Sequence, residues 1–599
     1  MNNPFGGGVN RYNAHGIARA KNRKKTLRRL LRYLKPYRGQ IALTIFLVVL
    51  TSGLELLGPY LSGEAIDIIA DSELHMTSVD VASIARIAAL MILIFVVSSF
   101  LQYLSAWMML KISKKIVCRM REDAFQSLIR ARVSYFDDRS TGDILSVISY
   151  DIDTVNTSLT SDIINILSSF FTIVFSLVMM LIIQPILVLI FVVTIPLSFL
   201  MTKKLIRKTR ALYSKRSKKM GELNGFGEEM ISGIKTIRLY SGEKTVSERY
   251  RAMNSEATEA YYQAEYYGCY MGPGVNFFNN LSLSLVCIAG ALLNVYRGFS
   301  YGSIAKFVQY SRKFSGPINE TANIFTDLQS ALSAAERVFA LIDCPEEDES
   351  GSLPLEEGKG EVKFDHVSFG YSEGIKVIDD LNLKVSAGEQ VAIVGKTGAG
   401  KTTIVQLLMR FYPVSDGAIY IDGNDISEIE RRQLRKAFAM VLQDTWLFEA
   451  SVYENLIYGN EGKTFEEVVE ACKASHIHDF ILSLKDGYQT VLSEGGTHIS
   501  KGQKQLLTIA RAMLSDAKML ILDEATSNVD TRTEIYIQEA MKSLMKGKTC
   551  FIIAHRLSTI RHADTILVMD RGKIVEKGNH RSLMEKKDVY FRLYQAQFD

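Results

Sequence analysis

The sequence predicts two unlike domains: an α-helical domain with six membrane spans, followed by an α/β domain built around a phosphate-binding loop. Long apolar segments are confined to the first half of the 599-residue chain, and from about residue 361 short β-branched runs alternate with amphipathic segments. Residues 395–402 read Gly-Lys-Thr-Gly-Ala-Gly-Lys-Thr. We place a basic segment with a short helix at residues 1–38, the membrane domain at 39–335, a linker at 336–360 and the nucleotide-binding domain at 361–599.

The N-terminal segment is strongly basic. Lysine and arginine are frequent between Arg19 and Arg38, and no Asp or Glu precedes residue 39. Directly before a hydrophobic helix, such a cluster indicates the cytoplasmic side of a membrane rather than a tail that binds nucleic acid. A secretory signal would place a short apolar core and a small-residue cleavage site here, and neither is present. We therefore expect a cytoplasmic N-terminus, no cleaved leader and no nucleic-acid partner.

Four apolar segments account for five membrane spans, which need about 20 residues each. Residues 87–110 carry no charge, and residues 39–62 predict one long helix with Glu55 inside it. Residues 163–202 are uncharged and about twice the length of one crossing, with Gln184-Pro185 as a natural reversal between two helices. Residues 266–296 supply the fifth span. The charged stretches at 111–162 and 203–265 predict helices that extend beyond the membrane.

The sixth predicted span, residues 302–332, is markedly polar. Charges in lipid cost at least about 2.5 kcal/mol each on insertion scales, so they are expected to face a water-filled cavity or a partner helix. A substrate pathway would provide such a water-filled cavity. Glu55, inside the first predicted span, is expected to require the same kind of environment. Alternatively, the cations lie near an interface and extend to water. The charged residues of this span are Lys306, Arg312, Lys313, Glu320 and Asp327.

The glycine-rich loop stands in the context that nucleotide binding requires. Residues 390–394 predict a buried strand, and residues 402–411 predict the helix that the loop opens. Backbone N–H groups of such a loop surround phosphate oxygens, Lys401 reaches the β- and γ-phosphates, and the Thr402 hydroxyl can ligate Mg²⁺. The candidate ATP-binding residues here are Gly395, Lys396, Thr397, Gly398, Ala399, Gly400, Lys401, Thr402 and Thr403.

A second strand, residues 519–522, ends in Asp523-Glu524. This places two carboxylates where a parallel sheet presents ligand-binding residues. Asp523 suits the Mg²⁺ shell, and Glu524 is the candidate that polarises the attacking water, since phosphoryl transfer mainly needs an aligned nucleophile and neutralised charge. The combination predicts an ATPase.

Together these motifs resemble the ATP-binding cassette (ABC) superfamily, and the chain looks like an exporter-type half-transporter over about residues 25–595. The resemblance implies that Tyr371 stacks on adenine, that Gln443 senses Mg²⁺ as a ligand, and that His555 contacts the γ-phosphate as a catalytic partner of Glu524. Each role has a physical basis in an aromatic face, an amide oxygen and an imidazole donor.

Further segments match the family's communication elements. Asn528-Val529-Asp530 resembles the loop that communicates across the dimer, and Glu494 falls where exporters place a charged residue facing the cytoplasmic helices. Tyr135-Phe136-Asp137 and residues 225–240 resemble the cytoplasmic loops whose short helices dock on the ATPase.

The family's signature, usually Leu-Ser-Gly-Gly-Gln, is altered here. It reads Ile499-Ser500-Lys501-Gly502-Gln503, so Lys501 replaces a glycine that lets backbone approach the partner's nucleotide. The chain therefore resembles the subunit of bacterial heterodimeric multidrug exporters that supplies the catalytic glutamate. The resemblance implies a second, non-identical half-transporter with an intact signature and an altered catalytic glutamate. A homodimer in which Lys501 merely adds a cation stays open.

The expected function is ATP-driven, Mg²⁺-dependent export of amphipathic drugs across a cell membrane by alternating access, with the ATPase domain cytoplasmic. A cavity that is apolar with scattered polar groups also suits lipids and hydrophobic peptides. A lipid or peptide exporter that works as a homodimer is therefore one alternative, and an ATP-gated channel or regulator is another.

Overall fold

The computed structural model divides into two compact units, Met1–Ala131 with Arg139–Cys344 and Arg132–Asp138 with Pro345–Asp599. It describes the chain with gaps. The described residues are 22–74, 79–348, 351, 353–355, 358–372, 374–443, 445–492, 499–523, 530–553 and 557–596, without the side chains of 73–74, 318–326 and 557–559.

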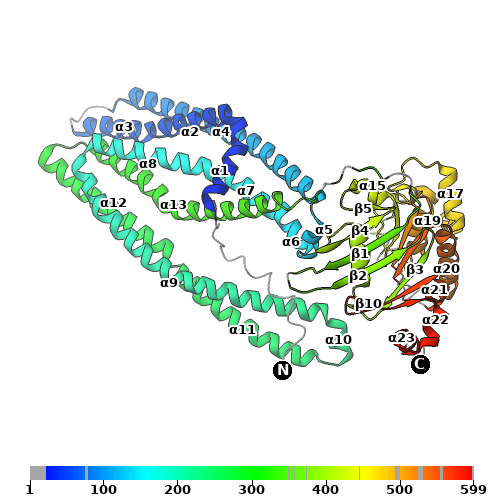
Figure 1. Cartoon of the computed structure of the whole chain (residues 1–599). Helices are drawn as coiled ribbons and strands as arrows, with labels where there is room; N and C mark the ends of the chain where they lie inside the picture. The colour runs from blue at the N-terminus through cyan, green and yellow to red at the C-terminus, as the bar shows by residue number, and fades with distance from the viewer. Residues whose placement is uncertain are drawn as a thin grey trace. The chain divides into compact units, whose positions relative to one another are not determined.

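The first unit is helical (Figure 1). π-helical turns at Val147–Asp151 and Ser158–Asp162 connect α6, α7 and α8. Its α-helices are α1 (Arg23–Leu34), α2 (Arg38–Glu55), α3 (Leu57–Leu74), α4 (Val81–Ile129), α6 (Thr141–Ser146), α7 (Ile152–Thr157), α8 (Ile163–Ile183), α9 (Pro185–Ser232), α10 (Ile234–Leu239), α11 (Glu243–Gly268), α12 (Met271–Arg297) and α13 (Tyr301–Ile342).

Within the described residues, five helical stretches are long and apolar enough to cross a membrane. They are Arg23–Ser72, Val81–Ile129, Thr141–Ile183, Pro185–Ser232 and Glu243–Arg297. The polar helix α13, 42 residues long, does not belong to this group. It is nevertheless one continuous helix through the predicted sixth span. It also runs seven residues beyond residue 335, so the first part of the predicted linker is helical.

The expectation of one long helix over residues 39–62 is wrong in detail. The structure has two helices, α2 and α3, which meet at Leu56. Pro59 has no backbone N–H, so the helical hydrogen bond to the Glu55 carbonyl cannot form. At the break, the carbonyl of the next residue, Leu56, accepts a hydrogen bond from the Tyr310 hydroxyl at 2.6 Å. The predicted reversal at Gln184-Pro185 is confirmed, because α8 ends at Ile183 and α9 begins at Pro185.

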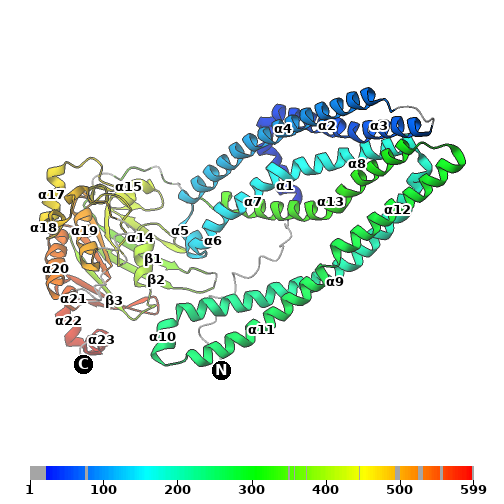
Figure 2. The ribbon, with the colours of Figure 1, turned by 180° about the vertical axis from the view of Figure 1, so that it is seen from behind.

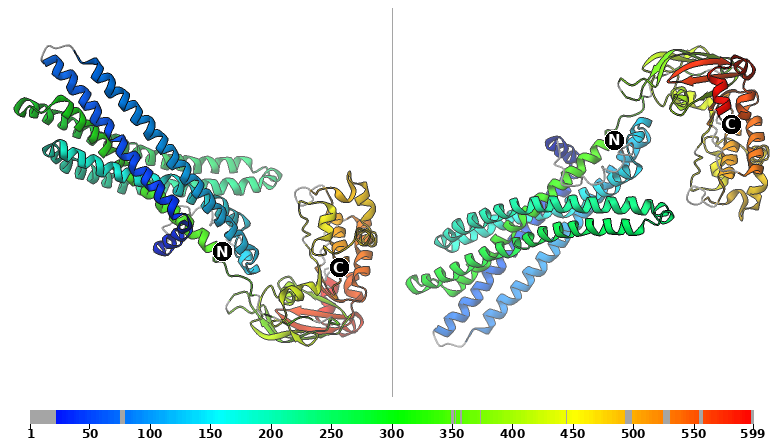
Figure 3. Two further views of the ribbon diagram at one scale, coloured as in Figure 1. Left: turned by 90° about the horizontal axis from the view of Figure 1, so that it is seen from above. Right: turned by 90° about the horizontal axis from the view of Figure 1, so that it is seen from below.

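The long helices of this unit pack side by side along their lengths. α9 runs beside α11 and α12 in the green and cyan pair of Figure 3, and α13 packs against α3 and α8. Arg337 of α13 donates to both carboxylate oxygens of buried Asp151, at 2.7 and 2.6 Å. Met120, Ile152 and Ala335 are fully buried and belong to one apolar cluster. Ile152 directly follows Asp151 in the sequence, and Ala335 precedes Arg337 by two residues.

The second unit is α/β and contains two sheets (Figure 2). Its strands are β1 (Val362–Phe369), β2 (Ile378–Val385), β3 (Gln390–Gly395), β4 (Asp416–Ile421), β5 (Asn424–Asp425), β6 (Phe438–Val441), β7 (Met519–Asp523), β8 (Thr549–Ile553), β9 (Thr565–Asp570) and β10 (Lys573–Gly578). Its helices are α5 (Val133–Asp137), α14 (Lys401–Leu408), α15 (Arg431–Lys436), α16 (Val452–Ile457), α17 (Phe465–Ala474), α18 (His478–Ser483), α19 (Lys501–Met513), α20 (Thr531–Met545), α21 (Leu557–His562), α22 (His580–Lys586) and α23 (Val589–Ala596).

The larger sheet has the order β10-β9-β3-β8-β7-β6 and is parallel except for β10. Its central strands are continuous apolar runs, as expected when helices cover both faces of a sheet. Ligands of such sheets bind at the carboxyl ends of the strands, where β3 leads into the phosphate loop and β7 ends at Asp523.

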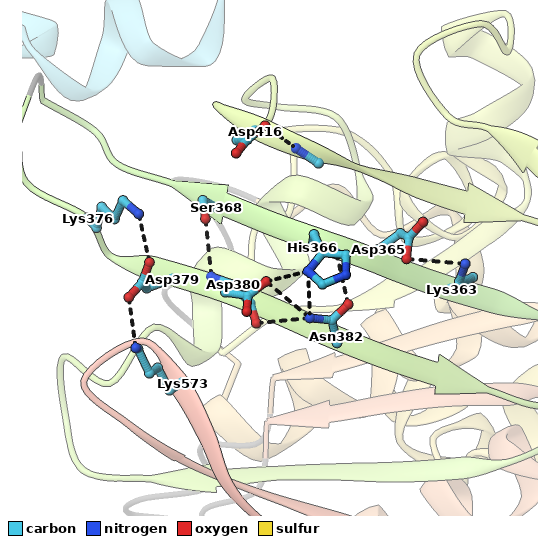
Figure 4. Close-up of polar contacts among 11 residues, drawn as sticks. Lys363, Asp365, His366, Ser368, Lys376, Asp379, Asp380, Asn382, Asp416 and Lys573 are labelled. Atoms are coloured by element: carbon cyan, nitrogen blue, oxygen red, sulfur yellow. Dashed lines mark hydrogen bonds and ion pairs between the residues drawn. The ribbon is translucent and has the colours of Figure 1, made fainter.

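The smaller sheet, β2-β1-β4-β5, is antiparallel and carries a bulge stabilised by side chains (Figure 4). His366 and Asp380 adopt positive φ angles of 51° and 55°, a conformation that His and Asp tolerate better than most residues. The His366 N–H donates to Asn382 Oδ1 at 3.0 Å, and the Asp380 N–H donates to Ser368 Oγ at 3.1 Å. These contacts satisfy backbone groups that the register shift leaves without a strand partner.

Candidate nucleotide-binding site

The phosphate loop has a backbone shape that only glycine adopts easily. Gly398 and Gly400 have φ angles of 82° and 100°. A Cβ on Gly400 would stand 2.8 Å from Ile378 Cδ1, so a larger residue would be both strained and crowded. Successive N–H groups in such a turn at a helix N-terminus form an anion-binding concavity. The loop therefore fits a chain of phosphate groups.

Lys401, the first residue of α14, folds its ammonium group back over this concavity. Its Nζ donates to the carbonyl oxygens of Gly395 at 2.7 Å and Lys396 at 3.1 Å. Burial lowers the pKa of Lys401 below its usual value, and the nearby Asp523 carboxylate partly opposes that shift. A desolvated cation held by neutral carbonyls interacts strongly with an incoming anion, because the local dielectric is low.

The two threonines after Lys401 differ in exposure. Thr402 is exposed at the start of α14, which fits the predicted role as a metal ligand. Thr403 is buried, and its hydroxyl lies 3.1 Å from that of Tyr371. Its side chain is therefore engaged with Tyr371, leaving its backbone for the phosphate loop.

The candidate metal-binding groups come from neighbouring strands. Asp523 ends β7, and Gln443 lies two residues beyond the end of β6, its parallel partner. Both residues therefore lie at the carboxyl edge of the sheet, where β3 also ends. Glu524, His555, Glu494, Asn528 and Val529 lie outside the described residues, so their predicted roles stay predictions. Asp530 caps α20 by accepting the Thr533 N–H at 3.0 Å.

Tyr371 lies beside the phosphate loop with 48 % of its surface exposed. Its hydroxyl bonds the side chains of Gln406 and Thr403, both on α14. Its ring packs edge-on against Phe369, with centroids 4.9 Å apart. The ring is thus fixed relative to the phosphate loop while remaining accessible to a base. Gln406 was not predicted as part of this site, since one amide on a helix gives no signal in the sequence.

The signature residues stand at the N-terminus of α19. The Ser500 hydroxyl accepts the Gln503 N–H at 3.2 Å, and the Ser500 N–H donates to Gln503 Oε1 at 2.9 Å, which completes a capping box. Lys501 is exposed at the first helical position, and Gly502 is buried. Ser500 and Gln503 therefore have a structural role in this chain, whereas Lys501 alters the exposed surface of the helix end.

The predicted docking segments fall in different units. Tyr135-Phe136-Asp137 lies in α5, which belongs to the α/β unit although its sequence neighbours α4 and α6 belong to the helical one. Residues 225–240 form the end of α9 and the short helix α10 in the helical unit.

The cations of α13 meet carboxylates on the neighbouring helices. Lys306, which is buried, donates to Glu64 at 2.6 Å and lies 3.8 Å from Asp67. Lys313 and Glu55 are 3.5 Å apart, and both side chains are about one-third exposed. Lys306 therefore faces a partner helix, one of the environments expected for it. The ion pair of Lys313 is longer than that of Lys306, and the Arg312 side chain is exposed.

Two family models match the chain. The model described as the ABC transporter transmembrane region matches residues 41–318, and the model described as ABC transporter matches residues 378–527. The second match contains the phosphate loop and Asp523.

Individual relatives match nearly the whole chain. The "uncharacterized ABC transporter ATP-binding protein YfiC" of Bacillus subtilis is 40 % identical over 97 % of this chain and 96 % of its own length. The "fatty acid ABC transporter ATP-binding/permease protein" of Mycobacterium bovis is 42 % identical over 86 % and 82 %. A solved structure, that of a bacterial Atm1-family ABC exporter with ATP bound, aligns with a TM-score of 0.74 at 26 % identity, over 94 % of this chain and 98 % of that one.

A phosphate loop on a parallel sheet, fused behind a helical membrane domain and matched along its length by such relatives, identifies the family. The chain belongs to the ABC transporter family, as an exporter-type half-transporter whose ATPase is coupled to transport.

Proposed function

We propose that this chain is one half of an ATP-driven exporter of amphipathic compounds that works by alternating access. The observation that carries the proposal is the fusion, in one chain, of the helical membrane domain to an α/β unit with a formed phosphate loop. We place the complex in a cell membrane with the ATPase domain in the cytoplasm, which the basic N-terminal segment supports.

In the proposed site the loop and Lys401 bind the phosphates, and Tyr371 stacks on adenine. Thr402, Gln443 and Asp523 would hold Mg²⁺, which supplies charge neutralisation at the phosphates when bound. An exposed hydroxyl, an amide oxygen and a carboxylate are hard oxygen donors of the kind that Mg²⁺ prefers. Glu524 orients and polarises the attacking water, and His555 donates to the γ-phosphate.

The substrate class is amphipathic, with an apolar body and a polar or charged head. The fatty acid in the name of the mycobacterial relative, 42 % identical to this chain, supports a lipid-like substrate. A wide apolar cavity with few polar groups would also accept drugs. Lys313 of α13 and Glu55 of α2, both about one-third exposed, are candidates for such polar groups.

We further propose that the working complex is a heterodimer with one hydrolytic site, built from this chain's Glu524 and the partner's signature. Lys501 supports this, because a bulky exposed cation replaces a residue that must let backbone approach the nucleotide. The second site, which contains Ser500 and Lys501, would be slow or inactive.

The test is transport into inside-out vesicles that contain the reconstituted complex. Palmitate and ethidium serve as a lipid-like and a drug-like probe. An exporter accumulates at least one probe against its gradient when MgATP is added outside, whereas an ATP-gated channel only equilibrates it. Equilibration without accumulation would contradict the proposal.

A further inference from the structure

We propose that Tyr412 is a positioning residue that links helix α5 to the adenine side of the ATP site. It joins Asp137 at the end of α5 to the ring of Tyr371. The position of α5 and the binding of a nucleotide would then both depend on the packed rings of Tyr412 and Tyr371. The proposal rests on the ATPase coupled to transport, and not on the substrate class.

The first half of the link is a hydrogen bond to α5. The Tyr412 hydroxyl donates to Oδ2 of Asp137, the last residue of that helix. Burial raises the pKa of Tyr412, and the Asp137 carboxylate raises it further. The phenol therefore keeps its proton throughout the neutral range and remains a donor. A hydrogen bond from a neutral donor to a carboxylate is among the stronger kinds.

The second half of the link is aromatic packing. The rings of Tyr412 and Tyr371 are perpendicular, with centroids 5.1 Å apart, and Phe369 completes the group at 5.6 Å from Tyr412. Edge-to-face pairs of this kind are directional, and close-packed rings transmit a displacement rather than absorb it. Because the Tyr371 hydroxyl also bonds Gln406 and Thr403, a shift of Tyr412 is felt at α14.

Tyr412 is itself held by a tight turn directly after α14. Arg410 adopts a φ of 51°, and its buried guanidinium donates to the carbonyls of Ile426 at 3.1 Å and Ile429 at 3.0 Å. The Phe411 N–H donates to the Gln406 carbonyl at 2.9 Å. The turn thus fixes Tyr412 to the same helix that opens the phosphate loop.

Helix α5 is anchored at its other end as well. The Arg132 N–H donates to the Pro345 carbonyl at 3.1 Å, and Arg132 Nε donates to the Glu346 carbonyl at 3.0 Å. The next residue, Glu347, accepts from both terminal nitrogens of Arg435, at 3.0 and 2.5 Å. Helix α5 and the segment after Cys344 are therefore bonded to one another within the α/β unit, and Tyr412 connects α5 to the site.

The experiment measures hydrogen–deuterium exchange of the full complex in lipid nanodiscs, with and without Mg-AMP-PNP. The peptides read are those that cover residues 132–138 and 401–408. The variants are Tyr412→Phe, which keeps the ring and removes the hydroxyl, Asp137→Ala, and Asp137→Asn, which keeps an acceptor. Tyr590→Phe is the matched control, because this buried tyrosine loses an equivalent hydrogen bond, 2.8 Å long, to His580 Nδ1.

In the unaltered complex the nucleotide should protect both peptides. In Tyr412→Phe and Asp137→Ala the protection of 401–408 should persist, while that of 132–138 falls by about half or more, as expected for a severed coupling. Asp137→Asn should restore most of the response, and Tyr590→Phe should match the unaltered complex.

Equal protection of 132–138 in Tyr412→Phe and the unaltered complex would overturn the link. So would an equal loss in both peptides or in the Tyr590→Phe control, since either would indicate general destabilisation. The exchange measurement requires only that the complex binds nucleotide. A complex that transports neither probe therefore still tests the link through Tyr412.

Discussion

At the scale of single residues, the site depends most directly on Lys401. Its ammonium group is buried and held by two loop carbonyls, so a phosphate replaces weak neutral acceptors with a charged one. Lys401→Met should reduce affinity for a fluorescent ATP analogue by about tenfold or more, the effect of losing a charged hydrogen bond in a low-dielectric site.

Lys396→Met is the control for that measurement. Lys396 belongs to the same loop, but its side chain is exposed and its carbonyl is what contacts Lys401. We expect its affinity to change by less than about twofold, as is usual for exposed positions. Equal losses in the two variants would contradict the role assigned to the Lys401 ammonium.

Lys501 gives a second prediction at this scale. If it blocks the signature, the chain purified without a partner should hydrolyse ATP slowly, and Lys501→Gly should raise the rate by about tenfold, because glycine restores close backbone approach. A colorimetric phosphate assay measures this. Fast hydrolysis by the unaltered chain alone, abolished by Glu524→Gln, would instead establish a working homodimer.

At the scale of elements, the contact between α3 and α13 is unusually close. A Cβ on Gly302 would stand 2.1 Å from the Gly63 carbonyl oxygen, and one on Gly63 would meet the Lys306 side chain. Asp67 accepts the Gly302 N–H at 2.6 Å, and Lys306 lies 4.7 Å from the centre of the Tyr60 ring. Small residues and buried polar pairs of this kind hold membrane helices together.

Loss of Lys306 should therefore destabilise the helical unit. Lys306→Met leaves Glu64 and Asp67 without their cation, and removing a buried ammonium group that contacts two carboxylates costs more than removing an exposed one. The apparent melting temperature in detergent should fall clearly. Lys313→Met is the matched comparison and should have the smaller effect, since Lys313 is about one-third exposed and lies farther, at 3.5 Å, from its carboxylate partner. The reverse order would contradict this assignment.

Helix caps predict a dependence of stability on pH. Backbone and side-chain hydrogen bonds from Ser451 hold the pKa of Glu454 below its usual 4.5, in the capping box of α16. A carboxyl whose pKa is lowered by folding contributes stability above its usual pKa, and this contribution is lost as the pH falls through the folded value. Glu467 makes the same box with Thr464 in α17.

The double variant Glu454→Gln/Glu467→Gln should therefore lose less melting temperature than the unaltered chain between about pH 5 and about pH 3, because glutamine has no proton to gain. Differential scanning fluorimetry of the full chain measures both slopes. Parallel slopes would show that these two carboxylates contribute nothing to acid sensitivity.

Element boundaries show where sequence reasoning succeeds and where it stops. Gln184-Pro185 predicts a helix reversal because proline starts a helix easily and cannot continue one. The break at Leu56 was missed, because Pro59 stands within an apolar run whose length alone suggested continuity. The helix after the phosphate loop ends at Leu408 rather than residue 411, since Arg410 turns left-handed to reach two distant carbonyls.

At the scale of the whole molecule, the two domain classes and the phosphate loop are readable from the sequence, because hydrophobic length and glycine spacing are local signals. The contact of Tyr412 with Asp137 is not, since 275 residues separate the two and Tyr412 belongs to no recognised motif, although Asp137 lies in a segment that resembles a docking loop. The same holds for Gln406 and Tyr371, which only the fold brings together. Long-range side-chain pairing is set by tertiary packing, which leaves no periodicity in the sequence.

The measurement that tests the central claim most directly compares transport by the unaltered complex and by Glu524→Gln in the same inside-out vesicles. The account predicts that MgATP drives accumulation of palmitate or ethidium in the first and none in the second, while both bind the nucleotide. Accumulation at an unchanged rate in Glu524→Gln would contradict it, because the energy would then not come from hydrolysis at this chain's carboxylate.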